Sequence, residues 1–346
     1  MALVTRFVNT GSTAGGDGTT NNTSGATRAY ASLNEWESNE QTDLVSDGDT
    51  HEVTCEGGID SANLTISSWG TNSTNFPTIK TTVDDPSGIF DSGKYFLDRG
   101  TGLGAILSIN DDNTKLSGIQ FRRDGPGGVG SQRPCIVIAA QAAGNTHDIE
   151  NCIFHSIAAA ASAQKVGIYS GDSDTVLTVK NCLFFNFDDT NDDGIDIAAQ
   201  TAGTAKLINN TFQNCTVGLA GLSNTKVTNN VFQDCGTDVS GTVDTGNSSD
   251  NLSDAASGLP GSNNVHSATL TFVNKAGDDF HLASGDTSAI GAGIGPSSDS
   301  DVLTTDVDGD ARSGTTCDIG FDEFVSVGGG LIIPIAAYHR RQFNRG

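Results

Sequence analysis

Near the middle of the chain, the pattern Ile149-Glu-Asn-Cys-Ile-Phe154 is followed by Val179-Lys-Asn-Cys-Leu-Phe184: an aliphatic residue first, asparagine third and phenylalanine sixth. Residues 116–121, 207–212 and 227–232 match it, with glycine in place of asparagine in the first of these. The phenylalanines recur at intervals of roughly 20 to 33 residues, which is the length of one turn of a solenoid. The repeat therefore predicts an all-β chain of stacked coils, a right-handed single-stranded parallel β-helix.

The spacing inside the pattern predicts a bend in each coil. Side chains alternate along a strand, so the first and sixth residues cannot point to the same face of one flat strand. A bend at the asparagine, which tolerates a left-handed backbone, returns both side chains to the interior. Because stacked coils lie about 4.8 Å apart, equivalent side chains form ladders. One buried axial stack is expected from five phenylalanines, Phe121, Phe154, Phe184, Phe212 and Phe232.

The composition suits short strands with many corners, and it limits the partners of the protein. The 346 residues include 43 glycines, and 18 Lys and Arg stand against 42 Asp and Glu, a formal charge of -24. Such an acidic body repels nucleic-acid phosphates and anionic membrane surfaces. The chain shows no signal-peptide pattern at its start and no run of about 18 apolar residues. We therefore expect synthesis in a host cytoplasm without a signal peptide, and neither nucleic acid nor membrane as a partner.

The cysteines are expected to be structural. Seven are spread along the chain without the paired spacing of zinc or redox motifs. Buried reduced thiols act as small apolar side chains. Cys215 and Cys235 occupy equivalent positions in successive coils, so a disulfide between them is the alternative.

Residues 1–50 are expected to form an N-terminal arm and cap, and residues 51–327 the β-helix itself. The segment 10–27 is rich in glycine, threonine and asparagine, which is typical of a loop or arm. Ser32 and Glu35 have the spacing of a capping box, which predicts one short helix containing Leu33 and Trp36. Such a helix covers the first coil, whose open edge would otherwise pair with other strands.

The last residues, 328–346, differ from everything before them. Three glycines form a hinge, and the aliphatic strip that follows leads to three arginines with no acidic residue. Aromatic and arginine side chains are enriched at interface hot spots. We interpret the segment as a tail that docks onto a partner, with a disordered tail as the alternative. The expected contact residues are Leu331, Ile332, Ile333, Ile335, Tyr338, Arg340, Arg341, Phe343 and Arg345.

Several segments resemble one broad superfamily. They are Asp17-Gly18, Tyr30-Ala-Ser-Leu33 and Asp47-Gly-Asp49 near the start, and residues 278–293, 306–312 and 318–323 near the end. Together they are similar to the opening and closing motifs of pectin-lyase-like β-helix proteins, and they span most of the chain. The resemblance implies the fold and leaves the activity open. The N-terminal block also looks like β-helix proteins encoded by phages, which implies a place in a virion.

One motif near the end has to be weighed as a calcium loop. Asp306, Asp308 and Asp310 alternate as calcium ligands do, but glycine stands fourth instead of sixth and the twelfth position is Cys317. The alternative is a carboxylate cluster that pairs with Arg312 and caps the last coil. We favour this alternative and expect no resident cofactor, with calcium as the one candidate.

Two aspartate clusters are the candidate catalytic groups if the protein is an enzyme. The larger one follows Phe184 and comprises Asp188, Asp189, Asp192 and Asp193; the smaller one is Asp111 and Asp112. Inverting glycoside hydrolases use two carboxyl groups about 6.5–9.5 Å apart. Resemblance to pectin-degrading hydrolases implies three signatures in successive coils, and only the bare Asp-Asp is present. A lyase needs a strong base, for which Arg122 and Arg123 are the candidates. The alternative is solvated turn aspartates, which are common, so we assign no catalytic residue.

Two functions from different classes remain. The first is a non-enzymatic phage virion protein, such as a capsid decoration, a head spike or a tail-associated β-helix, which contacts host-surface glycans. It accounts for the missing signal peptide, the acidity and the tail, and it implies other virion proteins as partners and a homo-oligomer, for example a trimer. The second is a polysaccharide lyase or glycoside hydrolase of the pectin-lyase-like fold, which leaves the tail and the missing motifs unexplained.

Overall fold

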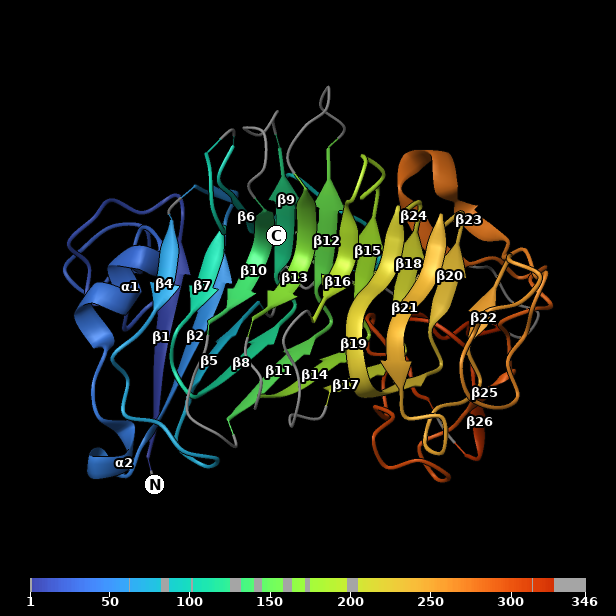
Figure 1. The fold of residues 1–346 in the computed structure, drawn as a ribbon. Coiled ribbons are helices and arrows are strands. Elements are labelled where there is room, and N and C mark those ends of the chain that lie inside the picture. Colours follow the sequence, from blue (N-terminus) through green and yellow to red (C-terminus); the bar gives the residue numbers. More distant parts are fainter. Residues whose placement is uncertain are drawn as a thin grey trace.

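Two large parallel β-sheets dominate the computed structural model, which describes residues 2–61, 63–81, 87–100, 102–124, 132–139, 145–157, 164–171, 175–197, 205–312 and 314–326. The sheets contain 14 and 8 strands, and the few helices are short. The strands lie side by side along one elongated body whose N-terminal and C-terminal coils are at opposite ends (Figure 1). This arrangement is all-β and consistent with a parallel β-solenoid. No described helix is both long and apolar enough to cross a membrane.

The larger sheet supplies two walls of the body, which meet at the long strand β19. Its order is β1 (Leu3–Asn9), β2 (Thr50–Glu56), β5 (Pro77–Lys80), β8 (Asn113–Ser117), β11 (Thr146–Glu150), β14 (Val176–Lys180), β17 (Ala205–Ile208), β19 (Val217–Thr228), β16 (Asp193–Asp196), β13 (Lys165–Ser170), β10 (Arg133–Ile138), β7 (Leu107–Ile109) and β4 (Leu64–Ile66). β21 (Thr237–Val243) also pairs with β19.

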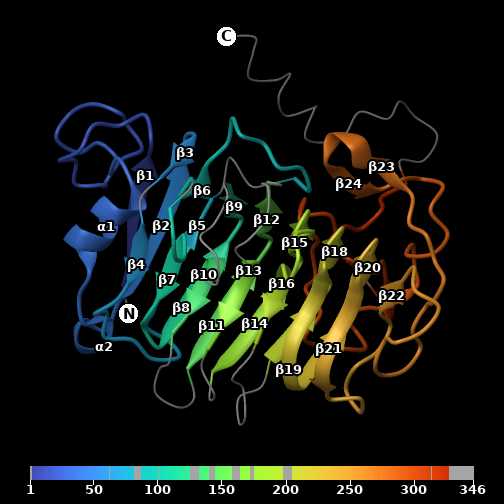
Figure 2. The same cartoon turned by 45° about the horizontal axis from the view of Figure 1, so that its top comes forward.

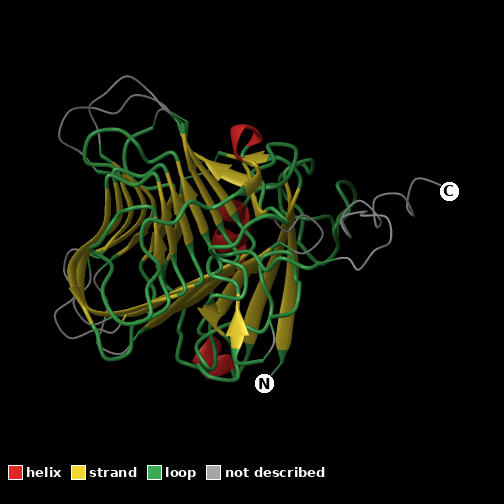
Figure 3. Cartoon of the chain, turned by 90° about the vertical axis from the view of Figure 1, so that its right-hand side faces the viewer, coloured by secondary structure: helices red, strands yellow, loops and turns green. Residues whose placement is uncertain are grey.

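The smaller sheet supplies the third wall. Its order is β22 (Leu252–Ser253), β20 (Val231–Gln233), β18 (Thr211–Gln213), β15 (Leu183–Phe185), β12 (Ile153–Ser156), β9 (Gln120–Arg123), β6 (Phe96–Asp98) and β3 (Ile59–Asp60). Each central coil gives one strand to each wall, as β11, β12 and β13 do in turn. The view along the body shows the three walls around a common interior (Figure 3).

The predicted bend is present in every coil that carries the repeat. Asn151, Asn181, Asn209 and Asn229 have φ angles of 56°, 50°, 55° and 56°, and Gly118 has a φ of 75°. These residues separate the strands of the first wall from those of the smaller sheet. Asparagine and glycine are the residues that visit this left-handed conformation at low cost.

The predicted phenylalanine stack is confirmed. Phe121, Phe154, Phe184, Phe212 and Phe232 are all fully buried. Successive rings lie 4.9, 4.5, 4.9 and 5.1 Å apart between centroids and are nearly parallel. The stack thus passes through five coils and forms the axis of the core.

A ladder of glycines lies beside this stack. A Cβ atom added at Gly167 would lie 2.7 Å from the ring of Phe184, and one at Gly194 would lie 2.7 Å from the ring of Phe212. At Gly218 the corresponding distance to Phe232 is 2.8 Å. The rings therefore occupy the space that side chains would fill, which explains glycine in the third strand of these coils.

A ladder of asparagines lies at the position that follows the bend residue, and it was not predicted from the sequence. Asn210, Asn230 and Asn251 are fully buried. The Oδ1 atom of each accepts the backbone N–H of the preceding coil, from Cys182, Asn210 and Asn230 in turn, at 3.0 Å. These side chains therefore satisfy backbone donors that the bend takes out of the strand ladder.

All seven cysteines are free thiols, and six of them are buried. Cys215 and Cys235 belong to equivalent turns but form no bridge. Burial raises the pKa of Cys215 well above its usual value, which keeps the thiol protonated and unreactive. The expectation of reduced structural cysteines fits this arrangement.

The N-terminal segment caps the first coils and also adds a strand. β1 pairs in parallel with β2 at the end of the large sheet. Helix α1 (Leu33–Glu40) begins at Ser32, whose side chain accepts from the backbone N–H of Glu35 at 3.2 Å. In a capping box the Glu35 carboxylate would accept from the backbone N–H of Ser32. Here it accepts from the backbone N–H of Ala31 instead, at 2.7 Å. α1 and α2 (Leu44–Asp47) lie over the N-terminal end (Figure 1).

The C-terminal segment does not cap the last coil, so this part of the sequence interpretation is wrong. Residues 270–326, here called the strap, run back along the outer face of the smaller sheet (Figure 2). The strap contains β23 (Phe272–Asn274), η1 (Lys275–Gly277), β24 (Asp279–Leu282), β25 (Gly293–Ile294) and β26 (Thr316–Cys317).

Apolar side chains and the bend asparagines hold the strap against the coils. Phe280, Val307 and Phe321 form one cluster with Ile153, Leu183 and Phe185 on the outer face of the smaller sheet. The Nδ2 atom of Asn181 donates to Thr305 O at 2.7 Å, and those of Asn209 and Asn229 donate to Gly320 O at 3.1 Å and to Ile294 O at 2.8 Å. The residues that bend the coils therefore also attach the strap.

Candidate functional site

An open groove lies between the corners of the smaller sheet and the strap. Its volume is about 520 Å³. It is lined by Asn186, Gln213, Asn214, Asp234, Lys275, Ala276, Asp278 and Phe280. Most of these side chains are polar, and they come from three successive coils and from one short segment of the strap.

Stacked corners of the solenoid form one wall of the groove. Asn186, Asn214 and Asp234 directly follow β15, β18 and β20, and their φ angles are 62°, 54° and 56°. Asn214 Nδ2 donates to Asn186 Oδ1 at 3.1 Å and to Asp188 Oδ2 at 3.1 Å. Gln213 Nε2 donates to Asp234 Oδ2 at 3.2 Å. The carboxamides and carboxylates are thus held in a fixed row at the spacing of the coils.

The strap forms the other wall and contributes the only cation among the lining residues. Lys275 makes an ion pair with Asp234 across the groove. The hydrogen bond from Lys275 holds the pKa of Asp234 below its usual value. Burial raises the pKa of Asp278. Phe280 is almost fully buried beneath these groups.

The four aspartates of the larger sequence cluster have different partners, although Asp189 and Asp192 both contact Lys165. Asp188 is exposed and lies at the groove through its bond with Asn214. Asp189 pairs with Lys165 Nζ at 2.8 Å, and Asp192 accepts from Lys165 N at 2.7 Å. Asp193 accepts from Gln164 Nε2 at 2.6 Å. Burial raises the pKa of Asp192 to about 7 and that of Asp193 to about 6.

Asp111 of the smaller cluster and the two arginines are engaged elsewhere. Asp111 is buried beneath the N-terminal cap, where its Oδ2 accepts from Trp69 N at 3.2 Å. Arg122 pairs with Asp98 at 2.6 Å and lies 4.7 Å from the ring centre of Phe96. Arg123 is fully buried and donates to the carbonyl oxygens of Gly102 and Gly104 at 3.2 and 2.6 Å. These contacts hold neighbouring loops and strands of the fold together.

The three aspartates of the predicted calcium loop also have different roles. Asp306 is buried, and its carboxylate accepts from the backbone N–H groups of Asp308, Asp310 and Glu323 at 2.9, 2.7 and 2.8 Å. Burial raises its pKa to about 6. Asp308 is exposed and faces His281 instead, with Nε2 to Oδ2 at 3.0 Å. Asp306 therefore closes a loop, and the three side chains are not directed at one point.

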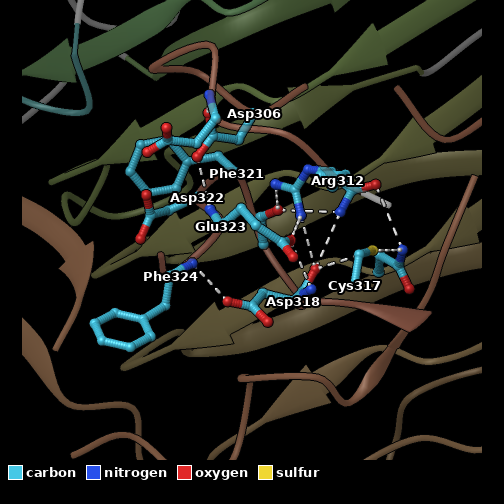
Figure 4. Close-up of polar contacts among 12 residues, drawn as sticks. Asp306, Arg312, Cys317, Asp318, Phe321, Asp322, Glu323 and Phe324 are labelled. Carbon is cyan, nitrogen blue, oxygen red and sulfur yellow. Dashed lines mark hydrogen bonds and ion pairs between the residues drawn. The ribbon is translucent and has the colours of Figure 1, made fainter. Parts of the chain in front are cut away.

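Arg312 is the centre of the neighbouring polar network. Its guanidinium is fully buried, pairs with Glu323 at 3.0 Å and donates to Asp318 O and Gly320 O at 2.9 and 2.8 Å (Figure 4). The ion-pair partner of this arginine is thus Glu323 and not the carboxylate cluster of Asp306, Asp308 and Asp310, so the pairing expected from the sequence is wrong. The network joins two parts of the strap along the flank of the coils and does not cap the last coil.

The predicted docking residues from Leu331 to Arg345 lie outside the described residues. The groove itself was not predicted, although Asp188 at its edge was a candidate residue. Asn186, Asn214 and Asp234 do share one sequence signal, since each is a polar residue two positions after the stacked phenylalanine of its coil. The strap wall had no such signal, because its position depends on where the segment folds back.

No protein-family model matches the chain, and no curated protein sequence matches it either.

Proposed function

We propose that the chain is a right-handed parallel β-helix of the pectin-lyase-like kind that serves as a non-enzymatic component of a phage virion and holds host-surface glycans in its flank groove. It would be a capsid decoration, a head spike or a tail-associated protein. The observation that carries the glycan-binding part is the groove of about 520 Å³, whose polar groups stand on a rigid stack of coils. Preorganised polar groups lose little conformational entropy when a ligand binds.

The lining favours a neutral, hydroxyl-rich glycan. Carboxylates and carboxamides accept hydrogen bonds from hydroxyl groups, and carboxamides and Lys275 also donate them. The formal charge of -24 repels uronate and sulfate groups. Neutral hexose or N-acetylhexosamine chains are therefore the substrate class that the groove fits best.

Blocking the groove is expected to abolish glycan binding. Ala276 is exposed on η1 and lines the groove, and no hydrogen bond of its side chain is lost when it is replaced. The variant Ala276→Trp should weaken binding to a neutral glycan at least about tenfold, because the indole fills space that the sugar needs. Binding is measured on a glycan array and then by titration with the best oligosaccharide.

Val273→Trp is the matched control, since Val273 is 57% exposed in the same segment but does not line the groove. It should bind like the unmodified chain. Equal loss in both variants, or binding that both retain, contradicts a glycan site in this groove.

An enzyme of the same fold is the second candidate, and one observation favours it. The raised pKa values of Asp192 and Asp193 lie in the range used by general acids. Against this candidate, Asp192 is fully buried and Asp193 is nearly so. Release of reducing ends or unsaturated products, lost in Asp192→Asn, would establish the enzyme in place of the virion protein.

The tail is proposed to dock the protein onto other virion proteins or onto further copies of the chain, for example in a trimer. Its aliphatic strip and arginines complement an acidic or apolar surface. The described contacts of the strap end near Phe324, whose backbone N–H donates to Asp318 Oδ2 at 2.7 Å. Residues 331–346 are therefore separated from the last described contact by the glycine hinge.

Deletion of residues 331–346 should leave a folded protein that no longer joins its assembly. The melting temperature is expected to change by less than about 2 °C, because the contacts of the strap and the coils are retained. Co-sedimentation with particles and the oligomeric state by light scattering are the measurements. Normal assembly of the truncated chain, or its unfolding, contradicts the docking role.

A further inference from the structure

A histidine and two carboxylates from three separate parts of the strap lie close together. His281 belongs to β24. Asp308 belongs to the loop that follows Thr305, and Asp322 lies near the end of the strap. One ligand atom from each of the three lies within 4.8 Å of the others. This is the only such group of three among the described residues.

The imidazole is oriented by a fourth carboxylate. His281 Nδ1 lies 2.6 Å from Asp279 Oδ1, so the Nδ1–H donates to Asp279. Nε2 is then the nitrogen that faces Asp308 and Asp322. A carboxylate that holds the far nitrogen of a histidine is the usual support of a metal-binding imidazole, since it fixes the tautomer and the ring orientation.

The second ring nitrogen, Nε2, faces the carboxylate of Asp308. The Nε2 atom is buried and has no hydrogen-bond partner within the described part of the chain. Oδ2 of Asp308 is nevertheless only 3.0 Å away. Two ligands of a tetrahedral zinc ion at 2.0–2.2 Å lie roughly 3.4 Å apart. A shared cation would hold the two atoms at a similar separation, in place of the ion pair that a protonated histidine makes.

A glycine from a distant loop encloses the site. A Cβ atom added at Gly88 would lie 2.5 Å from Nε2, 2.6 Å from Cε1 and 3.1 Å from Cδ2 of His281. These distances place the Gly88 backbone over the face of the ring and not in its plane. Asp322 is 5% exposed, and its carboxylate is turned away from the Arg312 network (Figure 4).

We propose that His281 Nε2, Asp308 and Asp322 bind one divalent transition-metal ion of the zinc class, with Asp279 as the group that orients the histidine. One imidazole and two carboxylates suit zinc better than calcium, which prefers oxygen ligands alone. The ion neutralises the negative charges of the carboxylates, which otherwise repel one another at this short distance. Because its ligands come from β24, the loop at Asp308 and the end of the strap, it links the strap to itself beside Gly88.

The competing arrangement is a protonated histidine held by ion pairs alone. Burial by itself lowers the pKa of His281, but its contacts with Asp279 and Asp308 raise that pKa to about 11. In that case the imidazolium is the only cation in the cluster, and no metal is needed. The two arrangements differ in whether zinc binds to this site.

The test is a titration of the chelator-treated full-length chain with zinc sulfate, followed by calorimetry and by thermal unfolding. We expect one strong site per chain and a higher melting temperature with zinc. Asp308→Asn should weaken zinc binding at least about tenfold; Asp308 is exposed, so the fold should persist. Asp310→Asn is the matched control, because it removes one charge from the same loop but no ligand, and its zinc affinity should change by less than about threefold.

Two results overturn the proposal. One is the absence of saturable zinc binding to the unmodified chain. The other is equal affinity of Asp308→Asn and Asp310→Asn, which assigns the zinc to other groups such as the thiols. In either case His281 is an imidazolium held by ion pairs.

Discussion

Replacement of Phe184 by alanine is expected to lower the free energy of unfolding by about 3–5 kcal/mol, the usual range for a core phenylalanine. The ring is fully buried and is stacked between Phe154 and Phe212, with centroid distances of 4.5 and 4.9 Å. Its edge also lies against Gly167, where no side chain can move into the cavity. Each coil buries its apolar side chains only against its neighbours, so a gap in the middle of the stack weakens two interfaces.

The measurement is denaturant unfolding followed by far-UV circular dichroism. Leu103→Ala is the control for loss of an apolar side chain at the surface, since Leu103 is 56% exposed. Its effect should stay within about 0.5 kcal/mol. A loss below about 1 kcal/mol for Phe184→Ala would show that the aromatic stack is not the centre of the core.

Replacement of Asn230 by leucine is expected to lower the stability by about 2–6 kcal/mol, with little change in side-chain volume. Asn230 Oδ1 accepts from Asn210 N at 3.0 Å, and its Nδ2 donates to Leu207 O at 2.7 Å. Leucine leaves these two buried backbone groups without the partner that the asparagine supplied. Each unsatisfied buried group costs about 1–3 kcal/mol.

Asn34→Leu is the control for the same change of side chain at an exposed position on α1. Thermal and denaturant unfolding of both variants distinguishes the effect of losing the buried hydrogen bonds from the effect of replacing asparagine by leucine in general. If Asn230→Leu is as stable as the unmodified chain, the buried asparagines do not support the stack of coils.

The repeat by itself determined the interior of the coils. An aliphatic residue, a bend residue and a phenylalanine at fixed spacing decide which side chains point inward, because alternation along a strand leaves no other choice. The phenylalanine ladder and the left-handed φ angles at Asn151, Asn181, Asn209 and Asn229 agree with that prediction. The helix after Ser32 was also readable, since a helix start depends on a few neighbouring residues.

The tertiary structure alone decided where the strap lies, and with it the groove and the histidine cluster. Phe280, Val307 and Phe321 are stabilised by packing against an apolar surface. The hydrophobic effect is non-directional, so it does not by itself favour the flank of the stack over its end. The choice rests on contacts such as Asn181 with Thr305, 124 residues apart along the chain. No local pattern contains such a contact, so His281, Asp308 and Asp322 come together only when the strap folds back along the coils.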